Sequence, residues 1–379
     1  MTNNNKSKTF FIIAGEESAD NHGSALINAI HTLNPEICFI GIGGEKMIKA
    51  GLQSIEDIKK LSIMGFVEIL KHLLFFNNLT KRILEEIIKT NPDQIILIDY
   101  PGFNLRLTKK IKKHHNIPIT YYISPQLWAW KENRIEIIRK HVDQMLVIFP
   151  FEKNWYEKRN ISVEFVGHPI FDEWTPTNKI DLCKLLKINI NKPIITLYPG
   201  SRSQELNHHL PLFIEVAKKI REKNGDIQFI LGLAKNLNLK KFVIPDWILI
   251  ENENPQKALE CADLALVASG TATIEAAVFG TPMIIVYKMH LLSWWISKLF
   301  IKVNYAGMVN IIANRKIMPE YLQNNAAAQT IANNANNIIN SKKQLKEMQL
   351  ELLHIKEKLK TKGASQKAAN HILLLSNIL

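Results

Sequence analysis

Residues 94–104 have the sequence QIILIDYPGFN, and this stretch decides the fold class. A continuous apolar run ends at Asp99 and is followed at once by Pro101 and Gly102. Such a run, bounded by turn residues, is typical of a strand that is buried on both faces of a sheet. In an open α/β sheet, an aspartate at the end of that strand is expected at the edge where ligands bind.

Similar apolar runs recur along the chain, with longer helix-patterned segments between them. They are TFFIIAG, ICFIGIGG, PITYYIS, QMLVIFP and VEFVGHP in the first half, and IITLYPGSR, IQFILGLA, WILIEN, DLALVASGT and PMIIVYK in the second. Strands that alternate with helices favour a parallel, doubly wound sheet. The polar segment 174–192 interrupts the pattern. We therefore predict two Rossmann-like domains that face each other across a cleft.

The predicted domains are residues 1–175 and residues 190–345. Residues 346–379 are predicted to form closing C-terminal helices, because LKEMQLELLHIKEKL carries apolar residues at helical spacing. The Asn/Ala-rich stretch after Asn324 is interpreted as a low-complexity loop or a weak helix.

The composition limits the class of protein. With 379 residues, 46% of them apolar and 22% charged, the chain falls in the globular range, which excludes wholesale disorder. Lys and Arg number 48 against 35 Asp and Glu, and the net charge of +13 favours anionic partners. The three cysteines are far apart and form no CxxC motif, so we expect reduced thiols. No run reaches the ~18 apolar residues of a membrane span, and we expect a soluble or peripheral protein.

Two short loops in the second half predict an anion site. In Tyr198-Pro199-Gly200-Ser201-Arg202, the glycine permits a tight turn before a helix whose free N–H groups, with Arg202, suit a phosphate or diphosphate. Ser269-Gly270-Thr271 also opens a helix, and Glu275 lies one turn later, where it can accept hydrogen bonds from ribose hydroxyls. Each loop alone is also explained as an ordinary turn or helix cap. The pair favours a nucleotide-diphosphate site.

Asp99 is the candidate general base, because partial burial at a strand end would raise its pKa. The alternative is that it anchors the turn at Pro101 and Gly102. Residues 15–23 form a second strand-end loop, in which His22 is the next candidate base. The pairs His114-His115 and His208-His209 are interpreted as surface residues. The chain lacks the GxxxxGK[ST], HExxH and DxD motifs, so no metal site is predicted.

Residues 61–79, LSIMGFVEILKHLLFFNNL, predict a helix with a broad apolar surface. A core helix is the ordinary explanation, but a doubly wound domain rarely needs so wide an apolar face. An exposed part of it is expected to receive acyl chains or to lie in a bilayer interface. The residues assigned to that contact are Phe66, Leu70, Leu73, Leu74 and Phe76; Trp294, Trp295, Leu299 and Phe300 are candidates for the same role.

Eight motifs occur in a fixed order along essentially the whole chain. They are Gly15–Asp20, Ser62–Glu68, Ile98–Asn104, Tyr122–Trp130, Phe149–Glu152, Val166–Pro169, Pro199–Arg202 and Ser269–Thr271. This ordered set resembles the lipid-A-disaccharide synthase family, which consists of glycosyltransferases with two Rossmann-like domains, the GT-B architecture. Ala19 departs from the family pattern, which usually has glycine there, whereas Asp20 is retained.

The resemblance implies an inverting transfer from UDP-2,3-diacylglucosamine to 2,3-diacylglucosamine 1-phosphate. No metal or other cofactor is expected, because the DxD motif is absent. Asp99 would then be the base, and Arg202 with the helix start at Ser269–Thr271 would stabilise the diphosphate. Glu275 would hold the ribose. Asn310 matches a family position that matters for activity.

The resemblance also implies a place in the cell. The family's substrates are anionic and acylated, which suits a peripheral enzyme at the anionic inner face of the cytoplasmic membrane. It further implies a homodimer, formed through the C-terminal helices.

Two other functions remain open from the sequence. One is another GT-B enzyme acting on UDP-N-acetylglucosamine, either a peptidoglycan transferase or a 2-epimerase, which would not need the apolar surface of residues 61–79. The other is a non-catalytic basic protein that binds a membrane or a polyanion with strong salt dependence. Nothing in the sequence resembles a nucleic-acid module, so no nucleic-acid partner is expected.

Overall fold

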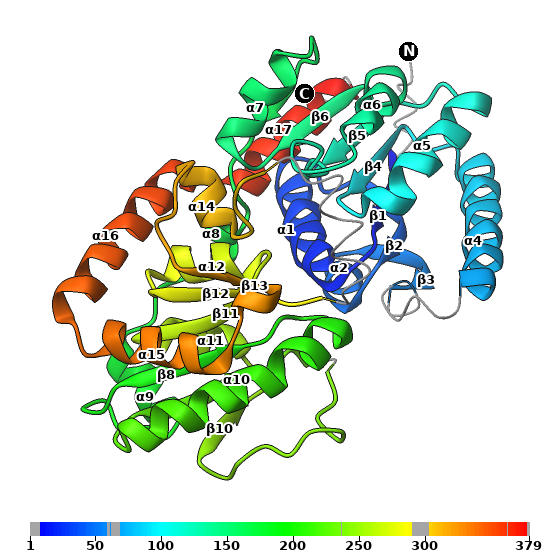
Figure 1. Cartoon of the computed structure of the whole chain (residues 1–379). Coiled ribbons are helices and arrows are strands. Elements are labelled where there is room, and N and C mark those ends of the chain that lie inside the picture. Colours follow the sequence, from blue (N-terminus) through cyan, green and yellow to red (C-terminus); the bar gives the residue numbers. More distant parts are fainter. Residues whose placement is uncertain are drawn as a thin grey trace. The chain divides into compact units, whose positions relative to one another are not determined.

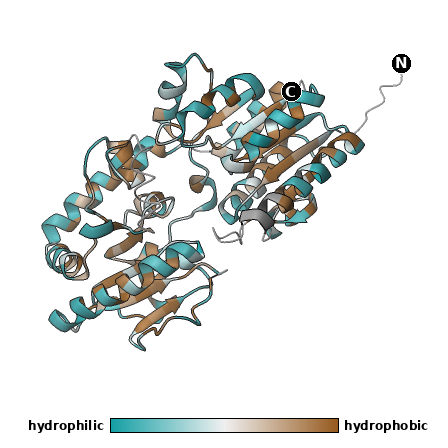
Figure 2. Ribbon diagram, turned by 45° about the vertical axis from the view of Figure 1, so that its right-hand side comes forward, coloured by the Kyte–Doolittle hydropathy of each residue, from teal (hydrophilic) through white to brown (hydrophobic). Residues whose placement is uncertain are grey.

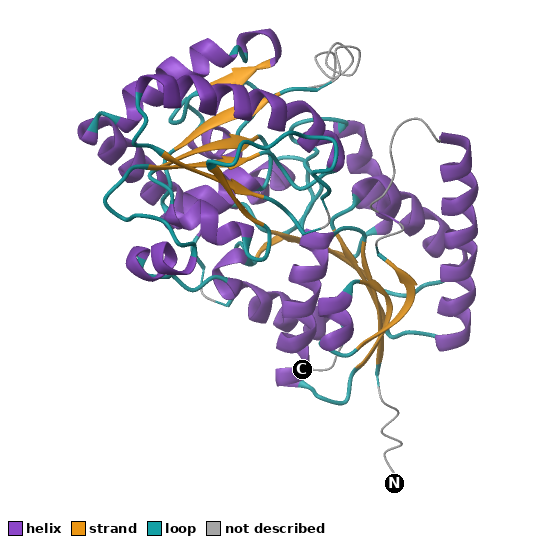
Figure 3. Cartoon of the chain, turned by 90° about the horizontal axis from the view of Figure 1, so that it is seen from below, coloured by secondary structure: helices purple, strands orange, loops and turns teal. Residues whose placement is uncertain are grey.

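The computed structural model describes residues 8–58, 61, 69–235, 237–289, 303–361 and 363–376. The chain forms two compact units, one made of Met1–Trp174 with Leu359–Leu379 and the other of Thr175–Lys358. In each unit, helices flank a sheet of parallel strands (Figure 1, Figure 3). The prediction of two doubly wound α/β domains is confirmed.

The first unit holds a seven-stranded sheet in the order β3-β2-β1-β4-β5-β6-β7. Its strands are β1 (Thr9–Ala14), β2 (Cys38–Gly43), β3 (Leu52–Asp57), β4 (Gln94–Ile98), β5 (Ile119–Tyr122), β6 (Gln144–Val147) and β7 (Glu164–Phe165). The strand order reverses between β1 and β4, which pair from Phe10 with Gln94 to Ala14 with Ile98. The loops after β1 and β4 therefore flank the topological switch point, where doubly wound sheets bind ligands.

The helices of the first unit lie on both faces of this sheet (Figure 1). They are α1 (Glu17–Leu33), α2 (Glu45–Lys49), α4 (Ile69–Thr90), α5 (Pro101–His114), the short 3-10 helix η2 (Glu132–Arg134), α6 (Ile135–His141), α7 (Pro150–Glu157), α8 (Ile170–Glu173) and α17 (Ala364–Leu375). Helix α17 packs against α1. The carboxylate of Asp172 accepts hydrogen bonds from the N–H groups of Gly363, Ala364 and Ser365, which fixes the start of α17 on this unit.

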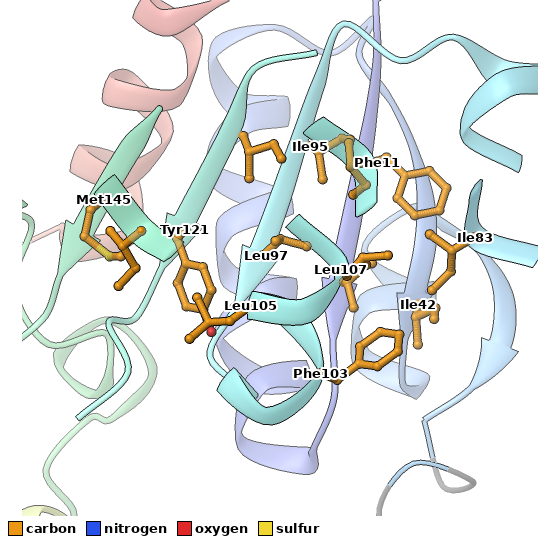
Figure 4. Close-up of a cluster of buried hydrophobic side chains, with 14 of the residues drawn as sticks. Phe11, Ile42, Ile83, Ile95, Leu97, Phe103, Leu105, Leu107, Tyr121 and Met145 are labelled. Carbon is orange, nitrogen blue, oxygen red and sulfur yellow. The ribbon is translucent and has the colours of Figure 1, made fainter. Parts of the chain in front are cut away.

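A dense apolar core holds α4 and α5 to one face of the sheet. Phe103 and Leu107 of α5 lie against strand side chains such as Phe11 and Leu97, and Ile83 joins them from α4 (Figure 4). All five side chains are buried. Burial of one such side chain contributes about 1.5–3 kcal/mol, so this layer fixes α5 and, with it, the loop that joins β4 to α5.

The second unit holds a six-stranded sheet in the order β10-β9-β8-β11-β12-β13. Its strands are β8 (Ile194–Tyr198), β9 (Gln228–Gly232), β10 (Ile248–Glu251), β11 (Leu264–Ala268), β12 (Met283–Tyr287) and β13 (Glu320–Leu322). Figure 2 shows that the strands are hydrophobic and the outer faces of the helices more hydrophilic. The order reverses between β8 and β11, where Val267 pairs with Tyr198. The two predicted anion loops directly follow these two neighbouring strands.

Two helices of the second unit lie where the sequence indicated an interruption of the pattern and a low-complexity loop or weak helix. The full set is α9 (Lys179–Leu185), α10 (Ser203–Lys223), α11 (Pro255–Cys261), α12 (Ala272–Phe279), α14 (Met308–Ala313), the 3-10 helix η3 (Gln323–Asn325), α15 (Ala328–Ile339) and α16 (Lys342–Leu359). Helix α9 lies in the polar segment 174–192 and buries Leu182 and Cys183. The Asn/Ala-rich stretch is the regular helix α15, because Ile331, Ala335 and Ile338 form a buried face that packs on α10.

In the described residues, no helix combines the length and the apolar character that crossing a bilayer requires. Segment 346–379 contains most of α16 and all of α17, and the boundary between the two units falls between Lys358 and Leu359.

Candidate active site

The loop after β8 is a tight turn that the Glu205 carboxylate stabilises by accepting hydrogen bonds from its backbone. Gly200 has φ +108°, a backbone conformation that favours glycine, and a Cβ there would lie 2.2 Å from Oε2 of Glu205. The same oxygen accepts hydrogen bonds from the N–H groups of Ser201 (3.0 Å) and Arg202 (3.3 Å). A glutamate at the third position of a helix that binds the N-cap backbone in this way is one half of a capping box.

This arrangement refines the predicted anion loop. Two of the N–H groups expected to face a phosphate already bind Glu205, so a bound anion would meet the later N–H groups of α10 and the guanidinium of Arg202. The Arg202 side chain is 67% exposed, and its Nη1 lies 3.9 Å from Oε1 of Glu205. Arg202 is therefore placed at the switch point with its charge accessible to a ligand.

The loop after β11 is the second predicted anion loop. Ser269 donates from its Oγ to the carbonyl oxygen of Ala306 (2.7 Å), and Gly270 has φ +139° with open space where a Cβ would stand. Thr271 is the N-cap of α12, so the first N–H groups of that helix face the same switch point as the β8 loop. The structure therefore brings the two loops together on neighbouring strands.

Glu275 lies one turn into α12 and is held from two sides. Its Oε2 accepts a hydrogen bond from the hydroxyl of Tyr198 (3.0 Å), and its Oε1 accepts one from Nε2 of Gln256 (3.3 Å). A Cβ at Gly232 would lie 2.7 Å from the Tyr198 ring, so the glycine at the end of β9 leaves room for that ring. These contacts fix the orientation of the carboxylate at the carboxyl edge of the sheet.

The amide of Asn310 is buried, and all four of its hydrogen-bonding positions are occupied. Its oxygen accepts from the N–H groups of Ile317 (2.8 Å) and Met318 (2.9 Å). Its nitrogen donates to the Met318 carbonyl (2.9 Å) and to Oε1 of Glu320 (2.7 Å). Glu320 in turn accepts from the N–H groups of Ala306 and Gly307. Asn310 thus fixes the segment whose carbonyl at Ala306 receives the bond from the β11 loop.

Asp99 occupies the matching position in the first unit, directly after β4. Asp99 and Tyr100 have φ of 43° and 49°, left-handed values that cost energy in non-glycine residues and that cluster at functional sites. The Asp99 carbonyl accepts from Nδ2 of Asn104 (2.8 Å) and from the Tyr121 hydroxyl (2.6 Å). A Cβ at Gly15 would lie 2.3 Å from the Tyr100 ring, so the loops after β1 and β4 are closely packed.

Both switch points therefore carry the residues that the sequence singled out, and comparison with known proteins identifies the family. The family model "Lipid-A-disaccharide synthetase" matches residues 10–373. Lipid-A-disaccharide synthase of Coxiella burnetii (strain CbuK_Q154) is 36% identical over 375 residues, which are 97% of this chain and 99% of the relative. Lipid-A-disaccharide synthase 1 of Legionella pneumophila (strain Philadelphia 1) is 38% identical and covers 93% and 94%.

The chain belongs to the lipid-A-disaccharide synthase family. It is an enzyme of the glycosyltransferase class, as the motif order predicted.

Solved structures share the fold of this synthase family member. The S. aureus MnaA-UDP co-structure has a TM-score of 0.66 at 13% identity and covers 98% of each chain. The UDP-GlcNAc 2-epimerase from Neisseria meningitidis bound to UDP-GlcNAc has a TM-score of 0.60 at 12% identity, again over 98% of each chain. At these identities the likeness concerns the GT-B fold alone, and the predicted architecture is confirmed.

The loop at the start of α1, part of the synthase family's first motif, has mainly a structural role in this structure. The Asp20 carboxylate is buried and accepts from the N–H groups of Gly44 (2.7 Å), Lys46 and Met47 (both 3.1 Å), so it caps α2. His22, the second candidate base, has its Nδ1 3.1 Å from Oε1 of Glu173.

Two histidines of the synthase are buried and neutral. The prediction that His209 is a surface residue is wrong, because its ring bridges the β8 loop and the end of β12. It lies 3.0 Å from the Pro199 carbonyl and accepts at Nε2 from the Lys288 N–H, and burial lowers its pKa to about 4. In the Val166–Pro169 motif, burial, followed by the nearby His22, lowers the pKa of His168 to about 3.

Glu152, the last residue of the Phe149–Glu152 motif, is a buried acid that the sequence did not single out. Its carboxyl accepts from Nε1 of Trp128 (3.1 Å) and from the N–H of Phe149 (3.2 Å), which ties α7 to the loop after β5. Burial outweighs these bonds and raises the pKa of Glu152 to about 8. Ser124, in the same loop, contacts the Tyr156 hydroxyl at 2.9 Å.

The raised pKa of Glu152 predicts a pH-dependent stability. A group whose folded-state pKa exceeds its unfolded value stabilises the fold below the unfolded pKa of about 4.5, and this contribution is lost as the pH rises towards 8. Glu152→Gln removes this loss because the amide does not titrate. The difference in Tm between variant and wild type should move in favour of the variant by about 3 °C or more between pH 5 and pH 8. A pH-independent difference, measured by calorimetry, would contradict the assignment.

Part of the apolar helix that the sequence assigned to a membrane lies outside the described residues. Phe66 of this helix is not described, and neither are the side chains of Leu70 and Leu73. The second group of candidates for membrane contact, Trp294, Trp295, Leu299 and Phe300, falls within residues 290–302, which also lie outside the described residues. Leu74 is 67% exposed. Phe76 differs from the expectation, because it is partly buried and its ring centroid lies 5.3 Å from that of Phe103 in the core.

In the described residues, neither the cysteines nor the side chains that could bind a metal form a cluster. Cys38 is exposed, Cys183 and Cys261 are buried, and all three are free. Across the ranges that the structure describes, no group of three or more His, Cys, Asp or Glu side chains is placed to hold a metal ion.

Proposed function

We propose that this chain transfers the diacylglucosaminyl group of UDP-2,3-diacylglucosamine to 2,3-diacylglucosamine 1-phosphate. The products are the β(1→6)-linked disaccharide 1-phosphate and UDP. One observation supports the proposal: the chain spans nearly the whole length of the synthases it matches, and four of its motif loops follow the strands at the two switch points. These loops are Gly15–Asp20, Ile98–Asn104, Pro199–Arg202 and Ser269–Thr271, whereas Ser62–Glu68 lies outside the described residues. Ligands of doubly wound sheets bind at switch points.

The proposed reaction is a single displacement with inversion. The 6-hydroxyl of the acceptor attacks the anomeric carbon of the donor and forms the new C–O bond. The bond from that carbon to the diphosphate oxygen breaks on the opposite face, and its electrons leave with UDP. The Asp99 carboxylate takes the proton of the attacking hydroxyl. This role is supported by the strained backbone that presents Asp99 at the end of β4.

In this proposal the second unit binds the donor. The guanidinium of Arg202, the N–H groups of α10 that follow the turn at Gly200 and Ser201, and the helix start at Ser269, Gly270 and Thr271 meet the diphosphate, whose negative charge grows as the bond breaks. Glu275 binds the ribose hydroxyls, and its contacts with Tyr198 and Gln256 support the role by fixing its orientation. Asn310 acts as a positioning residue, because its amide is fully used in holding the segment that contacts Ser269.

We also propose that the enzyme is peripheral, at the inner face of the cytoplasmic membrane, and forms a homodimer. The net charge of +13 and the exposed Leu74 on α4 support contact with an anionic lipid surface. Leu350 and Leu353 of α16, which are 49% and 48% exposed, support a contact between C-terminal helices of two copies. Nucleic acid is not part of the proposal.

The rival function is that of a GT-B enzyme that uses soluble UDP-N-acetylglucosamine. A direct comparison separates the two: the purified chain receives either the diacylated donor or unacylated UDP-N-acetylglucosamine, with the same acceptor, and UDP release is followed. The proposal expects turnover with the diacylated donor only. Faster turnover of the unacylated donor, or its epimerisation, would favour the rival.

Activity is expected to survive chelation of divalent metals. Arg202 and two helix N-termini supply positive charge where the diphosphate leaves, so the proposed reaction needs no metal cofactor. The initial rate in excess EDTA should stay within about twofold of the untreated rate, a difference below 0.5 kcal/mol. Complete loss of activity that is restored by magnesium or manganese would contradict this prediction.

A further inference from the structure

Three cationic side chains of the first unit lie on the segments that follow the neighbouring strands β4 and β5, and the proposed reaction has so far given them no role. Arg106 lies on α5, Lys131 precedes η2, and Arg134 ends η2. Arg134 is half-buried, and burial, followed by the charge of Arg106, lowers its pKa below the ordinary value. Burial, followed by the charge of Arg134, does the same to Lys131. Helix α5 begins two residues after Asp99 and packs against α6, which continues directly from η2, so the three residues lie on adjoining elements. We call these three residues the Arg134 cluster.

No acid within the described ranges forms an ion pair with Arg134, although one acid lies close in sequence. Glu132 accepts from Arg159 instead, at 2.8 Å from its Nε and 2.7 Å from its Nη2. The Arg106 Nε donates to the Gly102 carbonyl (2.7 Å). The second contact holds the Arg106 side chain in place, and neither contact pairs a member of the cluster with a negative charge.

The backbone conformation of Lys131 and the neighbouring Trp130 ring restrict the position of the Lys131 side chain. Lys131 has φ 53°, a left-handed value that is uncommon in lysine, and its Nζ lies 4.3 Å from the centre of the Trp130 ring. Bringing like charges together and partly removing them from water costs free energy. Strain and unpaired charge that persist at one place are features of ligand sites.

The position of the cluster indicates which ligand it meets. Tyr121 lies next to the candidate base, because its hydroxyl donates to the Asp99 carbonyl (2.6 Å). Burial, followed by the charge of Asp99, raises the pKa of Tyr121, whereas the charge of Arg134 acts to lower it. A ligand whose hydroxyl reaches Asp99 therefore extends over this part of the sheet edge. Guanidinium groups match the geometry of phosphate oxygens and bind them with strong, charge-assisted hydrogen bonds.

We propose that Arg134, supported by Arg106 and Lys131, binds the phosphate of the acceptor sugar. The inference rests on the proposed function, which makes the molecule at Asp99 a sugar phosphate. A single acceptor then spans the site, with its 6-hydroxyl at Asp99 and its 1-phosphate at the Arg134 cluster. The cluster thereby selects a phosphorylated acceptor over the same sugar without phosphate.

The test compares two acceptors in neutral detergent, where no anionic lipid competes: 2,3-diacylglucosamine 1-phosphate and the same sugar without phosphate. Arg134→Gln should lower kcat/KM for the phosphorylated acceptor by about 10- to 100-fold, the scale of one lost charge-assisted contact. It should leave kcat/KM for the unphosphorylated acceptor and KM for the donor nearly unchanged. Arg134→Lys should recover part of the preference because it keeps the charge.

Arg139→Gln is the matched control, because Arg139 lies on the next helix, α6, and is paired with Glu136 (3.3 Å). It should leave the preference for the phosphate intact. Arg106→Gln and Lys131→Gln repeat the test at exposed positions, where folding is not at risk, and each should lower the preference by a smaller factor.

Two results of the activity comparison would overturn the inference. One is an unchanged preference in all three Gln variants of the cluster, and the other is an equal loss on both acceptors, which indicates a structural role. A variant that loses only its binding to vesicles of anionic phospholipid also contradicts it, because the cluster then serves a lipid headgroup. Calorimetric binding of the two acceptors is measured beside activity. If wild type forms no disaccharide, the proposed function fails, while Arg134-dependent binding of the phosphorylated sugar still decides the inference.

Discussion

Asp99→Asn is expected to lower kcat by about 10²–10⁴-fold, which is the usual contribution of a positioned base. The amide keeps the size of the side chain but cannot take the proton of the acceptor hydroxyl. Asparagine also tolerates the left-handed backbone at this position, where φ is 43°, so the turn after β4 should survive. The bonds from Asn104 and Tyr121 reach the Asp99 carbonyl and do not depend on the carboxylate. Donor affinity should therefore stay near that of wild type.

Single-turnover rate, Tm and donor binding are measured together for this variant. The acid limb of the wild-type pH–rate profile should flatten or shift, because it reports the ionisation of the base. Asp226→Asn is the control, since Asp226 is 76% exposed and forms a surface pair with Lys192, and it should leave all values unchanged. Wild-type activity in Asp99→Asn would remove the base assignment and make His22 the next candidate. Loss of Tm in proportion to activity would favour a turn anchor.

Arg202→Ala is expected to lower kcat/KM by ~2–4 kcal/mol in transition-state terms, the scale for one lost donor that stabilises developing charge. The side chain is 67% exposed, so Tm should change little. The kcat/KM of Arg202→Lys should lie between those of wild type and Arg202→Ala, because lysine keeps the positive charge but cannot form the bidentate hydrogen bonds of a guanidinium.

The measurement is the steady-state rate with varied donor, together with UDP binding by calorimetry. Arg221→Ala is a matched control on the same helix, α10, where the Arg221 guanidinium stacks 4.6 Å from the centre of the Trp247 ring. Activity of Arg202→Ala within threefold of wild type would reject the diphosphate assignment.

Strands with continuous apolar sequence could be predicted, because burial on both faces of a sheet leaves an unambiguous signal. The strands β3 and β13 could not, because LQSIED is largely polar and EYL has only three residues, and both strands lie at the edges of their sheets. The sequence of helix α15 was interpreted as a low-complexity loop or a weak helix because it is rich in asparagine, although its apolar residues have helical spacing. In these cases tertiary packing decided a structure that local composition did not indicate.

The candidate site was predictable where strand ends and turn residues coincide, as at Asp99, Gly200 and Ser269. The sequence did not indicate which polar groups of the site already form hydrogen bonds within the protein. Glu205 binds two N–H groups of the anion loop, and a capping-box pattern was the available signal. The saturated amide of Asn310 depends on Glu320 and the 317–318 backbone, contacts that are set by the chain path rather than by a motif.

Formation of the disaccharide tests the central claim most directly. The purified chain is incubated with UDP-2,3-diacylglucosamine and 2,3-diacylglucosamine 1-phosphate, and the products are identified by mass spectrometry. We predict a β(1→6)-linked disaccharide 1-phosphate and UDP in equal amounts, with both greatly reduced in Asp99→Asn. Absence of the disaccharide, or release of UDP without it, would contradict the account.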